Sequence, residues 1–226
     1  MSSKRKIIKD IMDQEIYCIT AEMYSNGRSN IEMVTEMVKA GAKIIQYREK
    51  EKKLKDKYEE CKLIRAITHE AGVTFIVNDD LDIAILVGAD GVHIGQDDLP
   101  IEQVRRLVGD EMIIGLSTHS ALQAQDAVER GADYIGVGPI FKTATKKDVC
   151  DPVGYKYLDY VVQNIEIPFV AIGGIKEQQI AEVVKHGAKC IALVTDITGA
   201  ENVKDKMRRL KKLAFGYETV ANAEVL

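Results

Sequence analysis

The sequence predicts a single (β/α)₈ TIM barrel, an α/β fold in which eight parallel strands alternate with helices. Three observations predict it: a Gly-Ala motif that recurs before strand-like runs, eight short apolar runs, and polar residues where those runs end. The chain has 226 residues, 46% hydrophobic and 29% charged, as is usual for a globular protein with a sizeable core. We expect one domain over residues 1–226, with flexible ends at about 1–12 and 216–226.

The recurring motif is Gly-Ala, one polar residue and then a strand-like run. It occurs in "AGAKIIQYR", "VGADGVHIG", "RGADYIGVG" and "HGAKCIALV". The Gly suits the end of a helix, where the backbone turns left-handed. A helix end followed by a strand, repeated along one chain, indicates alternating βα units.

The expected strands are rich in Ile and Val, as in a parallel sheet that is buried on both faces. They cover about 15–20, 43–48, 73–78, 91–94, 112–116, 133–138, 168–172 and 190–195. Between them, helical spacing gives three apolar stripes: Ile31, Val34, Met37 and Val38; Ile180, Val183 and Val184; Val203, Met207 and Leu210. A doubly wound open sheet is the alternative, but no Gly-x-Gly-x-x-Gly follows the first strand.

Composition and charge exclude several classes of function. The net charge of −4, without a broad basic block, argues against general nucleic-acid binding. No apolar run approaches the length of a membrane span, and the N-terminus lacks the apolar core of a signal peptide, so we expect a cytoplasmic protein. The cysteines at 18, 61, 150 and 190 have no zinc spacing and are expected to be free thiols. The oligomeric state stays open, and a homo-oligomer is one of the possibilities.

Polar residues follow almost every expected strand. In a barrel these positions share one rim, and that rim carries the active site. The segments are "QYREK", "NDD", "GQDD", "GLSTHS", "GPIFKTATKKD", "IGGI" and "VTDI". Their clustering at one end predicts a site more strongly than any one of them does.

Two residue pairs that supply carboxylates, Asn78-Asp79 and Asp97-Asp98, end neighbouring strands. Carboxylate oxygens are the ligands that Mg²⁺ prefers, with water and substrate phosphate in its other positions. Asp79, Asp80, Asp97 and Asp98 each also precede an expected helix, so helix capping is the alternative for any one of them. Two pairs on adjacent strands, opposite a loop of lysines and threonines, favour a metal site.

Positive charge and hydroxyl groups at the same rim predict phosphate binding. Arg48 can grip a phosphate with two parallel hydrogen bonds, and Lys50 acts as a point charge. Thr143 and Thr145 offer donors, and Lys146 can neutralise a leaving diphosphate. The alternatives are a surface ion pair for Arg48 and a mobile charged loop for the threonines and lysines.

Glycines and histidines add weaker signals. Gly173-Gly174 allows close backbone approach before a helix that can bind an anion, or forms a plain tight turn. His93 lies within a strand and is expected to be a hydrogen-bonded barrel residue rather than a metal ligand. His119 is either a neighbour of a helix cap or a site residue.

These motifs, in this order, resemble the thiamine-phosphate synthase family, and the match runs from "QYREK" through "VNDDLDIAILVGADGVHIGQDDLP", "GLSTHS", "GVGPIFKTATKKD" and "AIGGI" to "ALVTDI". The resemblance implies a (β/α)₈ barrel and a Mg²⁺-dependent transferase. Such enzymes join 4-amino-5-hydroxymethyl-2-methylpyrimidine diphosphate to 4-methyl-5-(2-phosphoethyl)thiazole. The products are thiamine monophosphate and diphosphate.

The resemblance also implies residue roles. The pyrimidine diphosphate would be held by Gln46, Tyr47, Arg48, Glu49, Lys50, Asn78, Ser117 and Lys146. The Mg²⁺ would be held by Asp79 and Asp98. The thiazole phosphate would be held by Thr143, Ala144, Thr145, Gly174, Val194 and Thr195. Lys146, Ser117 and Arg48 would carry the catalysis. The chain departs from the family pattern at Ala21, after the first strand, and at Thr195, which keeps the hydroxyl of the usual Ser.

Three other functions compete with this one. A thiazole-phosphate tautomerase of the same fold would need an acid/base residue, with His119 as the candidate, and no diphosphate grip. A non-catalytic sensor of phosphorylated ligands would bind without turnover. A generic barrel aldolase or isomerase would need a Schiff-base Lys or a carboxylate base within a strand.

Overall fold

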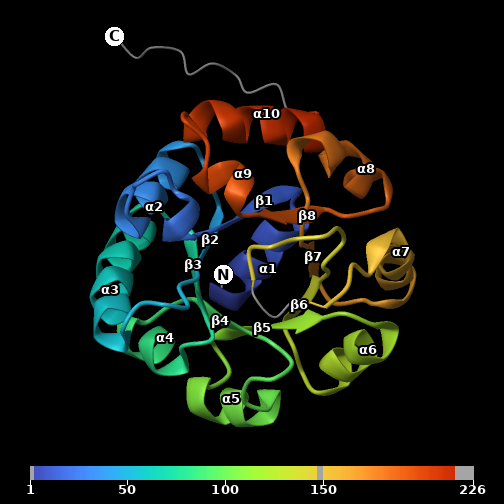
Figure 1. The fold of residues 1–226 in the computed structure, drawn as a ribbon. Helices are drawn as coiled ribbons and strands as arrows, with labels where there is room; N and C mark the ends of the chain where they lie inside the picture. Colours follow the sequence, from blue (N-terminus) through green and yellow to red (C-terminus); the bar gives the residue numbers. More distant parts are fainter. Residues whose placement is uncertain (1–2, 147–149, 217–226) are drawn as a thin grey trace.

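The computed structural model describes residues 3–146 and 150–216 and shows a closed barrel of eight parallel strands (Figure 1). Each strand pairs with its neighbours in chain order, and β1 pairs with β8 to close the ring. The strands are β1 (Glu15–Ile19), β2 (Ile44–Tyr47), β3 (Thr74–Asn78), β4 (Gly91–Ile94), β5 (Ile113–Thr118), β6 (Tyr134–Val137), β7 (Phe169–Ala171) and β8 (Cys190–Leu193).

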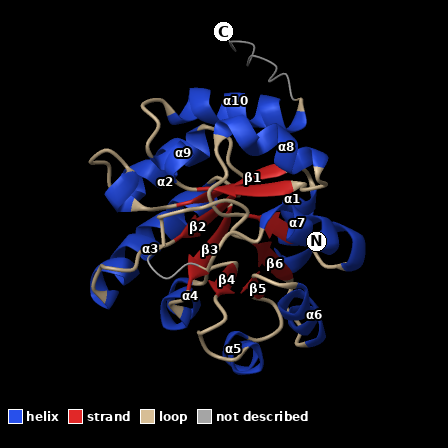
Figure 2. Cartoon of the chain, turned by 45° about the vertical axis from the view of Figure 1, so that its right-hand side comes forward, coloured by secondary structure: helices blue, strands red, loops and turns tan. Residues whose placement is uncertain are grey.

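Helices surround the strands on the outside of the barrel, as Figure 2 shows in blue around red. They are α1 (Ser3–Met12), α2 (Asn30–Lys39), α3 (Leu54–Glu70), α4 (Leu81–Val87), α5 (Ile101–Val108), α6 (Ala121–Glu129), α7 (Gly154–Asn164), α8 (Ile180–Lys185), α9 (Thr195–Thr198) and α10 (Val203–Phe215). Two short 3₁₀ turns, Glu22–Tyr24 and Glu177–Gln179, lie in loops. Among the described residues, none of these helices has both the length and the apolar character of a membrane span.

The predicted strands are confirmed, with ends that differ from the observed ones by at most two residues. The doubly wound sheet is wrong, because an open sheet would leave β1 and β8 unpaired. The recurring Gly has the predicted left-handed backbone, with φ of +64° at Gly88 and +86° at Gly131. This conformation lets each helix end and the next strand begin within a few residues.

The apolar residues form two layers. The outer layer lies between the strands and the helices and includes the predicted stripes, with Val34, Met37 and Val183 fully buried. The inner layer fills the barrel itself. Burying each large apolar side chain contributes about 1.5–3 kcal/mol, so these stripes hold the helices on the barrel.

Helix α1 lies across one end of the barrel, behind the ring of strands in Figure 1. Its Ile7 and Ile11 are one helical turn apart, are buried, and pack with Tyr17 and Ile44 inside the barrel. Sequence analysis assigns no element to residues 1–12, whereas residues 3–12 form this plug. The tail expected to be flexible falls, from residue 217 on, outside the described residues.

Candidate active site

A pocket of about 570 Å³ opens at the carboxyl ends of the strands, opposite the end that α1 closes. Every strand, or the loop after it, contributes to its lining. The predicted site residues that line it are Gln46, Arg48, Lys50, Asn78, Asp79, Asp98, Ser117, Thr143, Ala144, Thr145, Lys146, Gly174, Val194 and Thr195. Residues spread over 150 positions of sequence therefore meet in one cavity, as the barrel rule predicts.

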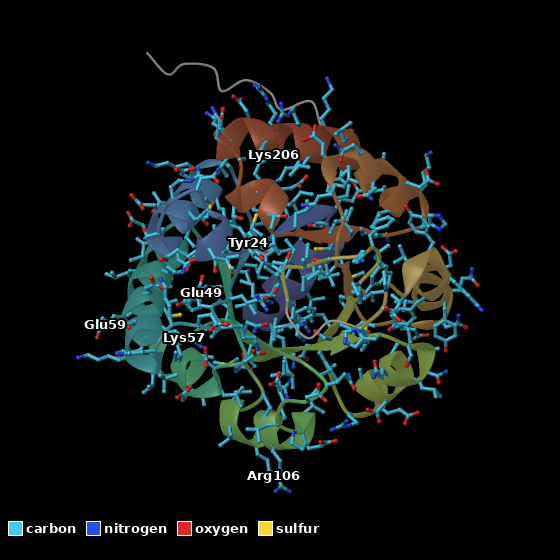
Figure 3. The ribbon with its side chains drawn as sticks, in the orientation of Figure 1. Tyr24, Glu49, Lys57, Glu59, Arg106 and Lys206 are labelled. Atoms are coloured by element: carbon cyan, nitrogen blue, oxygen red, sulfur yellow. The ribbon has the colours of Figure 1, made fainter. Side chains whose placement is uncertain are left out.

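Tyr47 and Glu49 are the two predicted site residues that do not line the pocket. Successive side chains of a strand point to opposite faces, so Gln46 and Arg48 enter the barrel while these two enter the helix layer. The Tyr47 hydroxyl donates to Glu60 Oε2 at 2.7 Å, and Glu49 Oε1 accepts from the Glu22 backbone N–H at 2.8 Å. In Figure 3, Glu49 lies on the side of α2 and α3, away from the barrel axis.

The pKa of Tyr47 shows how firmly this side chain is fixed in the helix layer. Burial first, and then the hydrogen bond to Glu60, raise that pKa well above its usual value. The phenol stays neutral and remains a donor to the carboxylate. A substrate contact at this strand end would have to use the backbone rather than the Tyr47 or Glu49 side chain.

Asp79 and Asp98 both line the pocket, at the ends of neighbouring strands. Asp79 has a φ of +61°, a conformation that costs a non-Gly residue free energy, and its backbone N–H donates to the His93 carbonyl at 2.9 Å. Its carboxylate contacts Lys50 Nζ, and Asp98 Oδ2 accepts from the Gly95 N–H at 2.6 Å. Strain of this kind is typical of functional positions.

The two carboxylates fit Mg²⁺ in its usual protein setting, which is one or two carboxylates with water and phosphate completing the shell. Both face a cavity large enough for phosphates, and the same opening is lined by the cations Arg48, Lys50 and Lys146, together with Lys142 and Lys176. Within residues 3–146 and 150–216, no cluster of three His, Cys, Asp or Glu side chains gathers around a common point. Arg48, Lys50, Asp79, Asp98 and Lys146 are called the rim below.

Helix capping does not account for the acidic pairs. Asp80 precedes α4 but makes no capping hydrogen bond; its carboxylate pairs instead with Lys57 Nζ at 2.9 Å, outside the pocket. Helix α5 begins after Pro100, two residues beyond Asp98. The capping alternative is therefore wrong for these residues.

The loop from β6 to α7 carries hydroxyl groups into the pocket. Thr143 Oγ1 and Thr145 Oγ1 are 3.2 Å apart, and the Thr145 N–H donates to Thr143 Oγ1 at 3.3 Å. Lys146 follows them and is exposed at the opening. Lys147 lies outside the described residues.

Gly173 and Gly174 allow this loop to pass close to the end of β7. A Cβ on Gly174 would lie 2.5 Å from the Lys142 carbonyl oxygen, and one on Gly173 would lie 2.4 Å from Pro139. Both glycines also have positive φ, which side chains rarely adopt. The close backbone approach that the sequence predicts at these two glycines is thus an approach to the loop between β6 and α7.

The structure adds pocket residues that sequence analysis did not single out. Tyr24, in the loop after β1, reaches the opening and donates to the Ala144 carbonyl at 3.4 Å (Figure 3). Lys176 Nζ lies 2.5 Å from Thr195 Oγ1 and 3.1 Å from Asp196. Ala21, where the chain departs from the family pattern after the first strand, is buried and does not line the pocket. Its carbonyl accepts a hydrogen bond from the Ser25 hydroxyl.

Two histidines, His93 and His119, had two possible roles each in the sequence analysis, and the structure shows the contacts of both. His93 is confirmed as a barrel residue, because its ring nitrogens lie 2.9 Å from Tyr134 Oη and 2.9 Å from Ser117 Oγ. Burial chiefly, with Lys146 adding to it and Asp98 opposing it, lowers the pKa of His93 to about 4, so the ring is neutral at pH 7. His119 lines the pocket, and its Nδ1 lies 2.6 Å from the Gly138 carbonyl oxygen.

Comparison with known proteins gives a consistent result. The family model described as thiamine monophosphate synthase matches residues 16–197. A thiamine-phosphate synthase of Pelotomaculum thermopropionicum is 64% identical over 210 residues, which cover 93% of this chain and 96% of the relative. A thiamine-phosphate synthase of Lawsonia intracellularis is 56% identical over 89% of this chain and 93% of the relative.

Solved structures agree with the sequence relatives. A thiamine phosphate pyrophosphorylase from Pyrococcus furiosus superposes with a TM-score of 0.82 at 35% identity, covering 90% of this chain and 96% of that one. A 3-hexulose-6-phosphate synthase superposes with a TM-score of 0.60 at 16% identity, a likeness that shows the fold alone.

Proposed function

The chain belongs to the thiamine monophosphate synthase family, and from that premise we propose how its pocket performs the transfer. The family enzymes are transferases that act on small molecules. The site roles below are our proposal for this chain. The observation that carries them is that lysine and arginine side chains, aspartate carboxylates and a threonine loop meet around one opening.

The rim cations bind the pyrimidine diphosphate through its phosphates. Arg48 suits a bidentate contact, and Lys50 and Lys146 act as point charges from the other strand ends. Negative charge grows on the diphosphate as its bond to the pyrimidine methylene carbon breaks. Cations placed beside that charge stabilise the transition state more than the bound substrate, and so they raise the rate.

Mg²⁺ would be held by Asp79 and Asp98, with water and diphosphate oxygens as its other ligands. When bound, the metal supplies Lewis-acid stabilisation of phosphate charge. Lys50, which contacts Asp79, is then free to turn toward the diphosphate.

The thiazole phosphate binds on the opposite side of the pocket. Thr143, Thr145 and Thr195 offer hydroxyls there, and Lys176 lies beside Thr195 with its positive charge. Gly174 and Val194 shape this side, and Ala144 offers its carbonyl to Tyr24. Holding the thiazole nitrogen close to the methylene carbon of the pyrimidine turns the attack of that nitrogen into a reaction between fixed partners.

The order of steps follows from the chemistry of the pyrimidine substrate. The aminopyrimidine can stabilise a cation at its methylene carbon, so diphosphate leaves first and the thiazole nitrogen then attacks. No covalent intermediate with the protein is required. Ser117 borders the same space and contributes a hydroxyl near the pyrimidine.

The test is product formation from the two synthetic substrates, with and without Mg²⁺. We expect thiamine monophosphate and diphosphate in equal amounts, and only with the metal. Binding of the thiazole phosphate without product, by the folded protein, would contradict the proposal and favour a sensor. Isomerisation of the thiazole phosphate would favour the tautomerase, with His119 as the next residue to change.

A further inference from the structure

Five polar side chains form one continuous chain of hydrogen bonds across the inside of the barrel. Ser117 Oγ lies 2.9 Å from His93 Nε2, and His93 Nδ1 lies 2.9 Å from Tyr134 Oη. Tyr134 Oη lies 3.0 Å from Tyr17 Oη, and Gln46 Nε2 donates to Tyr17 Oη at 3.1 Å. We call these five residues the floor relay. Its two ends, Ser117 and Gln46, are site residues from β5 and β2, whereas the three residues between them have no assigned role.

The barrel is shaped to hold the relay. A Cβ on Gly115 would lie 2.1 Å from the Tyr134 ring and 2.5 Å from His93 Nδ1, and one on Gly136 would lie 3.3 Å from His93 Cε1. A side chain on Gly115 would occupy the space of these rings, whereas one on Gly136 would require only a small shift of His93. Tyr17 and Tyr134 are 2% and 1% exposed, so their hydroxyls depend on partners within the protein for hydrogen bonds.

Counting donors along the relay fixes its direction. Tyr17 Oη accepts a hydrogen from Gln46, so its own hydrogen points to Tyr134 Oη. Tyr134 then gives its hydrogen to His93 Nδ1. A neutral imidazole with an accepting Nδ1 carries its hydrogen on Nε2, and that hydrogen points to Ser117 Oγ. The hydrogen of Ser117 is left to point into the pocket.

We propose that Tyr17, Tyr134 and His93 are positioning residues that fix the hydrogen-bond polarity of the pocket floor. At one end the relay makes the Ser117 hydroxyl a donor, and at the other it holds the Gln46 amide with its carbonyl oxygen free to accept. An aminopyrimidine offers the complement, with ring nitrogens that accept and an amino group that donates. This assignment of partner rests on the proposed function; the polarity of the relay does not.

The polarity is tested by nitrogen-15 NMR of the histidine side chains in the whole protein. His93 is assigned as the signal that disappears in His93→Asn. We expect the wild-type ring to be protonated at Nε2 and unprotonated at Nδ1, and Tyr134→Phe to abolish that preference because the donor to Nδ1 is gone. Protonation at Nδ1 in the wild-type protein would overturn the relay, whether or not the protein is a synthase.

The coupling to substrate is tested by kinetics of Tyr134→Phe and Tyr17→Phe, which break the relay at different points. Losing a neutral hydrogen bond should raise KM for the pyrimidine diphosphate about 3- to 10-fold, with KM for the thiazole phosphate unchanged. Tyr157→Phe is the matched control, because Tyr157 is also buried and donates to Thr118 at 2.7 Å, outside the pocket.

The outcomes separate the relay from the proposed function. Unchanged KM in both relay variants, or equal changes in Tyr157→Phe, would overturn the positioning role. Wild-type protein without synthase activity but with the expected tautomer would keep the polarity and refute the proposed partner. If a tyrosine variant fails to fold, the wild-type NMR and the other variant still decide the result.

Discussion

At the floor of the pocket, each polar side chain of the relay is hydrogen-bonded to another part of the protein, whereas the rim is more exposed and combines the Lys50–Asp79 ion pair with cations such as Lys146 at the opening. Tyr17, Gln46 and Tyr134 are almost fully buried, but Lys146 is exposed and Lys50 is 46% exposed. The floor is thus set before any ligand arrives. In the proposed function the rim binds phosphate and metal, so the two regions should fail in different ways when they are changed.

The largest effect is expected at the rim, in Lys146→Ala. Removing a cation from beside the leaving diphosphate should lower kcat about 10²- to 10³-fold and leave the melting temperature unchanged, because Lys146 is exposed. Lys156→Ala, an exposed lysine on α7, is the control and should keep full activity. An unchanged kcat in the Lys146 variant would remove this lysine from the mechanism.

The buried His93 of the floor relay should make the free energy of unfolding depend on pH. Because the pKa of His93 falls from 6.5 to about 4 on folding, chiefly through burial, the unfolded state holds more protons between these values. The contribution of the neutral ring is complete above about pH 6.5 and is lost as the pH falls toward 4, by up to about 3 kcal/mol.

Urea unfolding of wild type and His93→Asn at pH 7 and pH 4.5 measures this loss. The wild-type free energy of unfolding should drop further than that of the variant, since other groups titrate alike in both proteins. Parallel pH profiles would contradict the assignment of a buried neutral ring.

Asp79 and Asp80, which are adjacent after β3, should differ in their effect on metal affinity. Asp79→Asn removes the charge of a proposed metal ligand and should raise the Mg²⁺ concentration needed for half-maximal activity about 10- to 100-fold. Asp80→Asn should leave it unchanged, because that carboxylate pairs with Lys57 outside the pocket. Equal changes in both variants would point to general electrostatics rather than a metal ligand.

Adding a single methyl group at Gly115 or Gly136 tests how tightly the floor relay is packed. Gly115→Ala forces a Cβ to within 2.1 Å of the Tyr134 ring and should lower the free energy of unfolding by about 1–3 kcal/mol. Gly136→Ala meets its nearest atom only at 3.3 Å and should cost less. The reverse order in thermal or urea unfolding would show that the relay can move aside.

The rim could be predicted from the sequence because its signals are local. Arg48, Asp79 and Lys146 each follow an apolar run, and the barrel rule then brings them together. The alternation of strand side chains also puts Gln46 and Arg48 on one face, because they lie two positions apart. The same rule places Tyr47 on the other face, but the family resemblance included it in the site.

The floor could not be predicted, because its contacts join residues far apart in the chain. Tyr17 and Tyr134 are 117 positions apart, and each reads as an ordinary aromatic residue of a buried strand. Their hydrogen bond depends on how the closed barrel turns each strand. The α1 plug had a signal in Ile7 and Ile11, one helical turn apart, but nothing local indicated where that helix would pack.

The division of labour between floor and rim is tested most directly by steady-state kinetics of Tyr134→Phe and Lys146→Ala, measured side by side for both substrates. We predict that the rim variant loses kcat, and that the floor variant mainly raises KM for the pyrimidine diphosphate. Changes in the same kinetic parameter, in the same proportion, would contradict the account and show that floor and rim act as one unit.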